Sequence, residues 1–102
     1  MTNKQKESCH AILEHFGIEL QIIKSQEEFG ELMVELSKIL LLTIQSTEHD
    51  VKLYSDYVKL AEEIADTEIM LEQIKHGLGL YEVVENQIDF KLKELKAGSV
   101  GE

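Results

Sequence analysis

The chain has 102 residues, of which 43% are hydrophobic and 29% charged, with 20 acidic residues against 10 basic ones. This length accommodates one domain, residues 1–102. The formal net charge of −10 favours cations as partners and disfavours nucleic-acid polymers and anionic membrane surfaces, because their phosphates would be repelled.

The first two predicted elements are helices. A short helix covers residues 4–16 and ends before Gly17, a typical C-cap residue. Apolar residues then recur at spacings of three and four, which predicts one long helix from about 18 to 45. This stripe comprises Ile18, Ile22, Phe29, Leu32, Met33, Leu36, Ile39 and Leu40. Ser25-x-x-Glu28 has the form of a capping box, but the stripe runs through it, so we prefer an uninterrupted helix.

The second half of the chain repeats the helical pattern. The polar stretch 45–50 predicts a break. A second long helix follows to about residue 75, where Ser55-Asp56 is a possible interruption, and the sequence HGLG at 76–79 ends it. Its stripe comprises Leu53, Tyr57, Leu60, Ile64, Leu71, Ile74 and Leu78, and a last helix carries Val84, Ile88, Leu92 and Leu95. Residues 97–102 are expected to fray. With no strand alternation and no proline, the prediction is an all-α fold that resembles a four-helix bundle.

The cellular environment is predicted from cysteine content and hydropathy. A single cysteine, Cys9, excludes an internal disulfide and fits a reducing cytoplasm. No positively charged leader precedes an apolar segment, so we expect no signal peptide. The longest apolar run, residues 39–44, is much too short to span a bilayer. We therefore expect a cytoplasmic protein.

Two acidic pairs carry the strongest chemical signal. Glu28-x-x-Glu31 and Glu63-x-x-Asp66 each place two carboxylates on adjacent turns of a predicted helix. If the two long helices pack antiparallel, both pairs face each other, and four converging carboxylates need protons or cations. Mg²⁺ is the natural partner because it takes hard oxygen ligands.

The alternative is a solvated helix face on a non-enzymatic helical interaction module, since acids at this spacing are common. Two observations favour a metal site. Both pairs lie beside the apolar stripes, and the acids lack matching bases. Glu27, Glu28, Glu31 and Glu35 have only Lys24 and Lys38 nearby, whereas a solubilising face more often interleaves lysine at i+4.

The stretches QEEFGELMVEL and LAEEIADTEIMLEQI together resemble the MazG-like, all-α nucleoside triphosphate pyrophosphohydrolases. That family's signature is E-x-x-E, a spacer and E-x-x-D, often with an acid before each block. It matches here as Glu28-x-x-Glu31 and Glu63-x-x-Asp66, preceded by Glu27 and Glu62. The lead-in FGIELQIIK and the final helix IDFKLKEL are also similar, so the resemblance covers about residues 16–96.

The resemblance implies Mg²⁺-dependent hydrolysis of a (deoxy)nucleoside triphosphate to a monophosphate and pyrophosphate, with Mn²⁺ as a possible substitute. It implies that Glu28, Glu31, Glu63 and Asp66 hold the metal, that Glu27 or Glu62 acts as the base, and that Gln21 and Lys91 bind substrate. It also implies a MazG-type core completed by dimerisation, in a homodimer or tetramer. A phosphoribosyl-ATP pyrophosphohydrolase of the same superfamily is an alternative.

Overall fold

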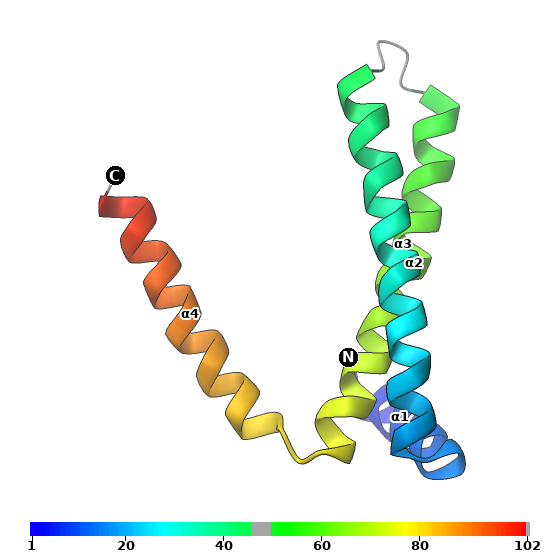
Figure 1. Ribbon diagram of the computed structural model, residues 1–102, viewed down its shortest axis with the longest axis vertical. Coiled ribbons are helices and arrows are strands. Elements are labelled where there is room, and N and C mark those ends of the chain that lie inside the picture. The colour runs from blue at the N-terminus through cyan, green and yellow to red at the C-terminus, as the bar shows by residue number, and fades with distance from the viewer. Residues whose placement is uncertain (46–49, 102) are drawn as a thin grey trace.

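The described residues form four helices (Figure 1): α1 Asn3–Phe16, α2 Ile18–Gln45, α3 Asp50–Gly77 and α4 Tyr81–Gly101. The computed structural model describes the backbone of residues 1–45 and 50–101 and the side chains of residues 1–44 and 54–98. No strand occurs in this described part of the chain, so the predicted all-α fold is confirmed. None of the described helices is long and apolar enough to cross a membrane.

Local sequence explains where α1 begins and ends. The Thr2 hydroxyl accepts a hydrogen bond from the Gln5 backbone N–H at 3.1 Å, and the Gln5 side chain accepts one from the Thr2 N–H at 2.8 Å. This reciprocal capping box satisfies donors that the first helical turn leaves free. At the other end, Gly17 has a φ of 88°, a conformation that glycine adopts without a steric penalty. The predicted C-cap is confirmed.

The two long helices are uninterrupted. Ser25 lies inside α2, where its hydroxyl donates to the Ile22 carbonyl oxygen at 2.6 Å, and the sequence Ser55-Asp56 lies inside α3. Of the predicted break at 45–50, residues 46–49 lie outside the described part of the chain. The last helix is assigned as far as Gly101, and the fraying expected for residues 97–102 stays a prediction.

Helices α2 and α3 form a hairpin, to which α1 and α4 are attached. Helices α2 and α3 run antiparallel along their length, and α1 packs against both at the base of the hairpin (Figure 1). Helix α4 departs at an angle and is joined to the hairpin by contacts with α3 and by Tyr81, whose hydroxyl lies 3.1 Å from His10 Nε2 of α1. The α3–α4 turn includes Gly79, with a φ of 66°. The radius of gyration is 17.1 Å, against about 13 Å for a compact domain of 100 residues. Within one chain, the described helices do not close around a shared core.

The interior of the hairpin is polar, contrary to what the apolar stripes suggest. Gln21, Glu28 and Glu35 recur every seven residues along α2, face α3 and are only 7%, 8% and 4% exposed. A seven-residue repeat keeps one face turned toward a partner helix, so these positions occupy the seam. The predicted core residues Met33, Leu36 and Leu40 are instead exposed by 69%, 48% and 59%.

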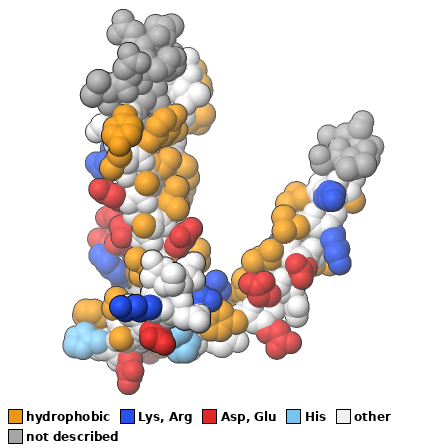
Figure 2. All heavy atoms as spheres, turned by 180° about the vertical axis from the view of Figure 1, so that it is seen from behind, with side chains coloured by type: hydrophobic (Ala, Val, Ile, Leu, Met, Phe, Trp, Pro, Cys, Tyr) orange, Lys and Arg blue, Asp and Glu red, His pale blue; other side chains and the backbone are white. Residues whose placement is uncertain are grey.

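Hydrophobic side chains consequently lie on the outside (Figure 2). The described side chains include only three buried hydrophobic residues, Cys9, Leu13 and Met70. Exposed apolar residues follow the outer faces of the hairpin and continue along α4, where Phe90 and Leu92 are 58% and 59% exposed. The prediction that the stripes need cover from outside the chain therefore has a structural basis, although the oligomer itself stays a prediction.

Candidate functional site

The α2–α3 seam is a ladder of facing polar side chains. Near the base, the Gln21 amide donates to the Gln73 side-chain oxygen at 2.7 Å. Further along, Glu35 pairs with Lys59 at 3.6 Å and with Lys38 at 3.1 Å. The antiparallel register that these contacts define brings the two acidic pairs together between them.

Three carboxylates converge in the middle of this ladder. Glu28 and Glu31 from α2 and Glu63 from α3 each offer an oxygen that lies within 4.8 Å of the other two. Glu28 is buried, Glu63 is half-buried and Glu31 is exposed, so the group opens from the seam toward solvent. We call Glu28, Glu31, Glu63 and the adjacent Asp66 the carboxylate cluster. The structure thus brings together three of the four residues that the resemblance assigns to a metal, and Asp66 lies beside Glu28.

Electrostatic repulsion inside the carboxylate cluster is visible in its proton affinities. The negative charge of Glu28, followed by desolvation and the charge of Glu63, raises the pKa of Glu31. Burial, followed by the charge of Glu28, raises the pKa of Asp66. Glu31 and Asp66 therefore hold a proton more tightly than isolated carboxylates do, and a cation would relieve the same repulsion.

Unpartnered oxygen atoms indicate that the carboxylate cluster suits a hard cation. One oxygen of Glu28 and one of Glu63 are buried without a hydrogen-bond partner among the described residues. A buried anionic oxygen without a partner is costly, and Mg²⁺ binds carboxylate oxygens of this kind. Glu28, Glu31 and Glu63 therefore fit the metal that the family resemblance implies, with Asp66 beside them.

The two acids expected to serve as bases lie at the edge of the cluster. Glu27 is largely exposed and pairs with Lys24 at 3.5 Å. Glu62 is exposed on α3, and its charge contributes to the raised pKa of Asp66. Both residues are near the cluster carboxylates, and nothing in their geometry separates one from the other as a base.

A cavity of about 490 Å³ adjoins the carboxylate cluster. Its walls are mainly apolar side chains from the first three helices: Ile12, Phe16, Leu20, Ile69 and Met70. Gln21 and Gln73 add a buried amide pair, while Glu28 and Asp66 form its acidic end together with Lys24. An apolar cavity with a few converging polar groups is typical of small-molecule sites.

The predicted substrate-binding residues are separated in the structure. Gln21 lines the cavity of about 490 Å³, and its role toward a substrate stays a prediction. Lys91 lies on α4, which makes no contact with α2 in the described part of the chain and projects away from the hairpin (Figure 1). Within one chain, Lys91 is therefore not brought to the carboxylate cluster.

Sequence reasoning did not find two residues of the cavity. Gln73 lies seven positions after Asp66, and Lys24 lies four positions before Glu28. Both spacings place a residue on the same helix face as a predicted ligand, so the signal was present. It is weak, because glutamine and lysine occur at such positions on most polar helices.

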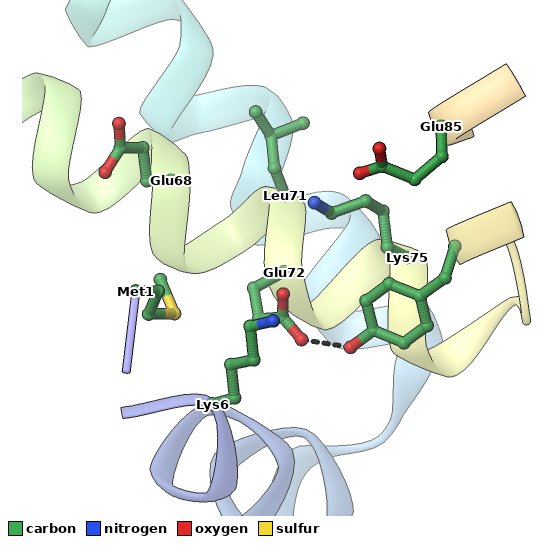
Figure 3. Close-up of a pocket in the computed structure, with 8 residues that line it drawn as sticks. Met1, Lys6, Glu68, Leu71, Glu72, Lys75 and Glu85 are labelled. Carbon is green, nitrogen blue, oxygen red and sulfur yellow. Dashed lines mark hydrogen bonds between the residues drawn. The ribbon is translucent and has the colours of Figure 1, made fainter. Parts of the chain in front are cut away.

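A second polar cluster, built by Glu72, His10 and Tyr81, lies on another face of α3, at its junction with α1 and α4. Glu72 is 4% exposed and accepts hydrogen bonds from the Tyr81 hydroxyl, shown in Figure 3, and from His10 Nε2 at 2.8 Å. Burial alone would raise the pKa of Glu72, but these hydrogen bonds lower it overall. Burial and the same carboxylate raise the pKa of Tyr81 to about 12.

This second cluster ties the first residue of α4 to the base of the hairpin. The His10 ring also stacks on His76, with ring centroids 3.6 Å apart. Lys6 and Lys75 reach into the adjoining cavity of about 380 Å³ (Figure 3). These contacts orient α4 where it leaves α3, and no sequence motif predicted them.

Comparisons of this chain with protein-family models, with curated proteins and with solved structures found no match. The MazG-like resemblance therefore rests on the residues and spacings of the sequence itself.

Proposed function

We propose that this protein hydrolyses a nucleoside triphosphate to a nucleoside monophosphate and pyrophosphate, using Mg²⁺ held by the carboxylate cluster. One observation carries the proposal. Three carboxylates converge within 4.8 Å of one another, two of them with buried unpartnered oxygens, beside a cavity of about 490 Å³. This combination suits a ligand with an anionic, metal-seeking end and a planar, largely apolar end.

Different residues would bind the two ends of the ligand. Glu28, Glu31, Glu63 and Asp66 would hold Mg²⁺ or Mn²⁺. A metal bound there offsets the charge of the phosphates and lowers the pKa of an attacking water. Glu27 or Glu62 would take the proton from that water as it attacks the α-phosphorus, and pyrophosphate would leave.

The nucleoside would occupy the cavity. Phe16, Ile69 and Met70 offer apolar surface for a base, and Gln21 with Gln73 offers amide groups that can meet the edge of a base. The acidic end of the cavity then receives the phosphates. The buried free thiol of Cys9 suits the reducing cytoplasm that we propose as the location.

We also propose that the chain works as a homodimer or a tetramer. Its accessible surface is 8010 Å² for a mass of 11.7 kDa, whereas a compact monomer of this mass exposes about 5,900 Å². The excess of roughly 2,100 Å² per chain matches what an obligate interface buries. Because many large hydrophobic side chains are exposed, a second copy that covers these faces would complete the core.

A second copy also offers a role for Lys91. The end of α4 carries Lys91, Lys93 and Lys96, while the hairpin presents the carboxylate cluster, so the two surfaces are complementary in charge. If α4 of one chain packs along the hairpin of another, Lys91 can meet substrate phosphates in the partner's site. Lysine contacts phosphate as a point charge.

The proposal is tested by product analysis on a panel of nucleotides. The panel contains canonical and modified ribo- and deoxyribonucleoside triphosphates together with phosphoribosyl-ATP, each assayed with Mg²⁺, with Mn²⁺ and with EDTA. We expect monophosphate and pyrophosphate from at least one triphosphate, only when metal is present. Preferred cleavage of phosphoribosyl-ATP would identify the related enzyme instead. If none of the compounds releases pyrophosphate, the non-enzymatic interaction module is the better explanation.

A further inference from the structure

Lys24 is the one lysine among the described side chains that pairs with the carboxylate cluster. Its ammonium lies 3.2 Å from Glu28 Oε1 and 3.5 Å from Glu27 Oε2. The seam's other paired lysines, Lys38 and Lys59, both bind Glu35 instead. The charge of a single side chain therefore offsets part of the negative charge that the cluster gathers.

The position of Lys24 connects the cluster to the cavity. It shares the cavity lining with Glu28 and Asp66. Its own side chain is 51% exposed, whereas that of Glu28 is 11% exposed. The ammonium thus stands at the boundary between a buried carboxylate and the space that a ligand would enter. The lysine stem has four rotatable carbons, so the ammonium can change partner without any movement of the helix.

Helix stability does not explain this ion pair. Lysine stands four residues before glutamate here, and this order stabilises a helix less than glutamate followed by lysine. A half-exposed pair also contributes little because solvent screens it. The pair instead occupies one oxygen of Glu28, while the other oxygen is buried and has no hydrogen-bond partner among the described side chains. An ammonium and a divalent cation would compete for the same carboxylate.

From this competition we infer that Lys24 is a tethered counter-ion with two positions. In the metal-free protein it holds the Glu28 carboxylate, and when a divalent cation occupies the cluster it turns toward the phosphates of the bound nucleotide. This inference rests on the proposed function. It assigns Lys24 as a phosphate-binding residue of the same chain, in addition to the role proposed for Lys91 of a second copy.

Replacing Lys24 by methionine tests both positions of the ammonium, because Lys24→Met keeps an unbranched side chain and removes the charge. Without nucleotide, Lys24→Met should bind Mg²⁺ about threefold to fivefold more tightly than the wild type, because an exposed competitor of modest strength is gone. With saturating Mg²⁺, the KM for the nucleotide should rise about tenfold, because a charged hydrogen bond to phosphate is lost. Titration calorimetry measures the first effect and pyrophosphate release the second.

Two further variants serve as controls. Lys38→Met removes an ammonium that pairs with Glu35 outside the cluster, and it should change neither constant. Lys24→Arg keeps a positive charge at the same position and should restore most of the nucleotide affinity. The opposite signs of the two effects distinguish this role from simple damage to the helix, which would weaken both ligands.

The outcomes separate this inference from the proposed function. If the wild type binds Mg²⁺ and releases pyrophosphate, but Lys24→Met binds Mg²⁺ no more tightly or leaves the KM unchanged, the two-position role of Lys24 is wrong and the proposed function stands. If the wild type neither binds Mg²⁺ nor releases pyrophosphate, the proposed function fails, and the role of Lys24 fails with it.

Discussion

Replacing Glu63 by glutamine is expected to lower the turnover of a nucleoside triphosphate by on the order of 100-fold to 1,000-fold, the usual cost of removing one group that stabilises charge in a transition state. Glu63 is the member of the three-carboxylate group that comes from α3, and one of its oxygens is buried with no hydrogen-bond partner in the part of the chain that the structure describes. The amide is nearly the same size as the carboxylate, so packing should survive. It is a weaker ligand for Mg²⁺ because it carries no charge.

The same substitution should stabilise the metal-free protein. The charge of Glu28 chiefly, and that of Glu63 in addition, raises the pKa of Glu31. A carboxyl whose pKa is raised on folding stabilises the fold below its unfolded pKa, and this contribution is lost as the pH rises through the folded value. Without the charge of Glu63, folding raises the pKa of Glu31 less, so less stability is lost when Glu31 ionises. The melting temperature of Glu63→Gln should therefore exceed that of the wild type at neutral pH, and the gap should narrow toward pH 4.

Glu68→Gln is the matched control for Glu63→Gln. It lies five residues further along α3 and lines the cavity beside Glu72 rather than the one beside the carboxylate cluster. It should change turnover little and should show no pH-dependent gain in melting temperature. Near-normal activity of Glu63→Gln, or an equal loss in both variants, would show that the carboxylate cluster is a solvated face.

A mixture of two impaired variants is expected to recover about a quarter of wild-type activity at low substrate concentration if α4 of one chain completes the site of another. Lys91→Ala should raise the KM for nucleotide about tenfold, while Glu63→Gln should lower turnover by on the order of 100-fold to 1,000-fold. When equal amounts are unfolded together and refolded, half of the dimers are mixed. Each mixed dimer holds one site with an intact Glu63 from one chain and an intact Lys91 from the other.

The same mixture also shows whether Lys91 acts only within its own chain. If Lys91 acts within its own chain, every site in a mixed dimer lacks one of the two residues, and activity measured at low substrate concentration stays at the level of the separate variants. Lys96→Ala, mixed in place of Lys91→Ala, controls for a general loss of positive charge on α4. Sedimentation of the same samples reports the oligomer, and a monomer at micromolar concentration would contradict the proposed assembly.

The positions of the helices were predictable because periodicity and caps are local properties. The spacing of apolar residues located α2 as one helix through Ser25, and Gly17 marked the end of α1. The prediction of which face is buried was less successful. Met33 and Leu36 belong to the apolar stripe and yet are exposed, because the hairpin turns Glu28 and Glu35 inward. Periodicity identifies an apolar face but does not say whether its partner lies in the same chain.

The carboxylate cluster was predictable in composition but not in geometry. The two acidic blocks are local signals, and an antiparallel arrangement was sufficient to bring them together. Whether Glu31 lies opposite Glu63 depends on the register of the hairpin, which is set by long-range contacts. The contacts of His10 with Glu72 and Tyr81 span 62 and 71 positions. No local pattern encodes such contacts, and for that reason the second polar cluster was not predicted.

The most direct test of the metal site is the melting temperature of the nucleotide-free protein as Mg²⁺ is added. A ligand that binds only the folded state stabilises it by mass action, by about 2.7 kcal/mol at 100 times its dissociation constant. For a domain of this size that corresponds to an upward shift of at least about 10 °C. We expect a saturable rise that EDTA reverses and that Glu63→Gln largely loses. A shift no larger than that from sodium chloride of equal ionic strength would contradict a divalent-cation site on the α2–α3 seam.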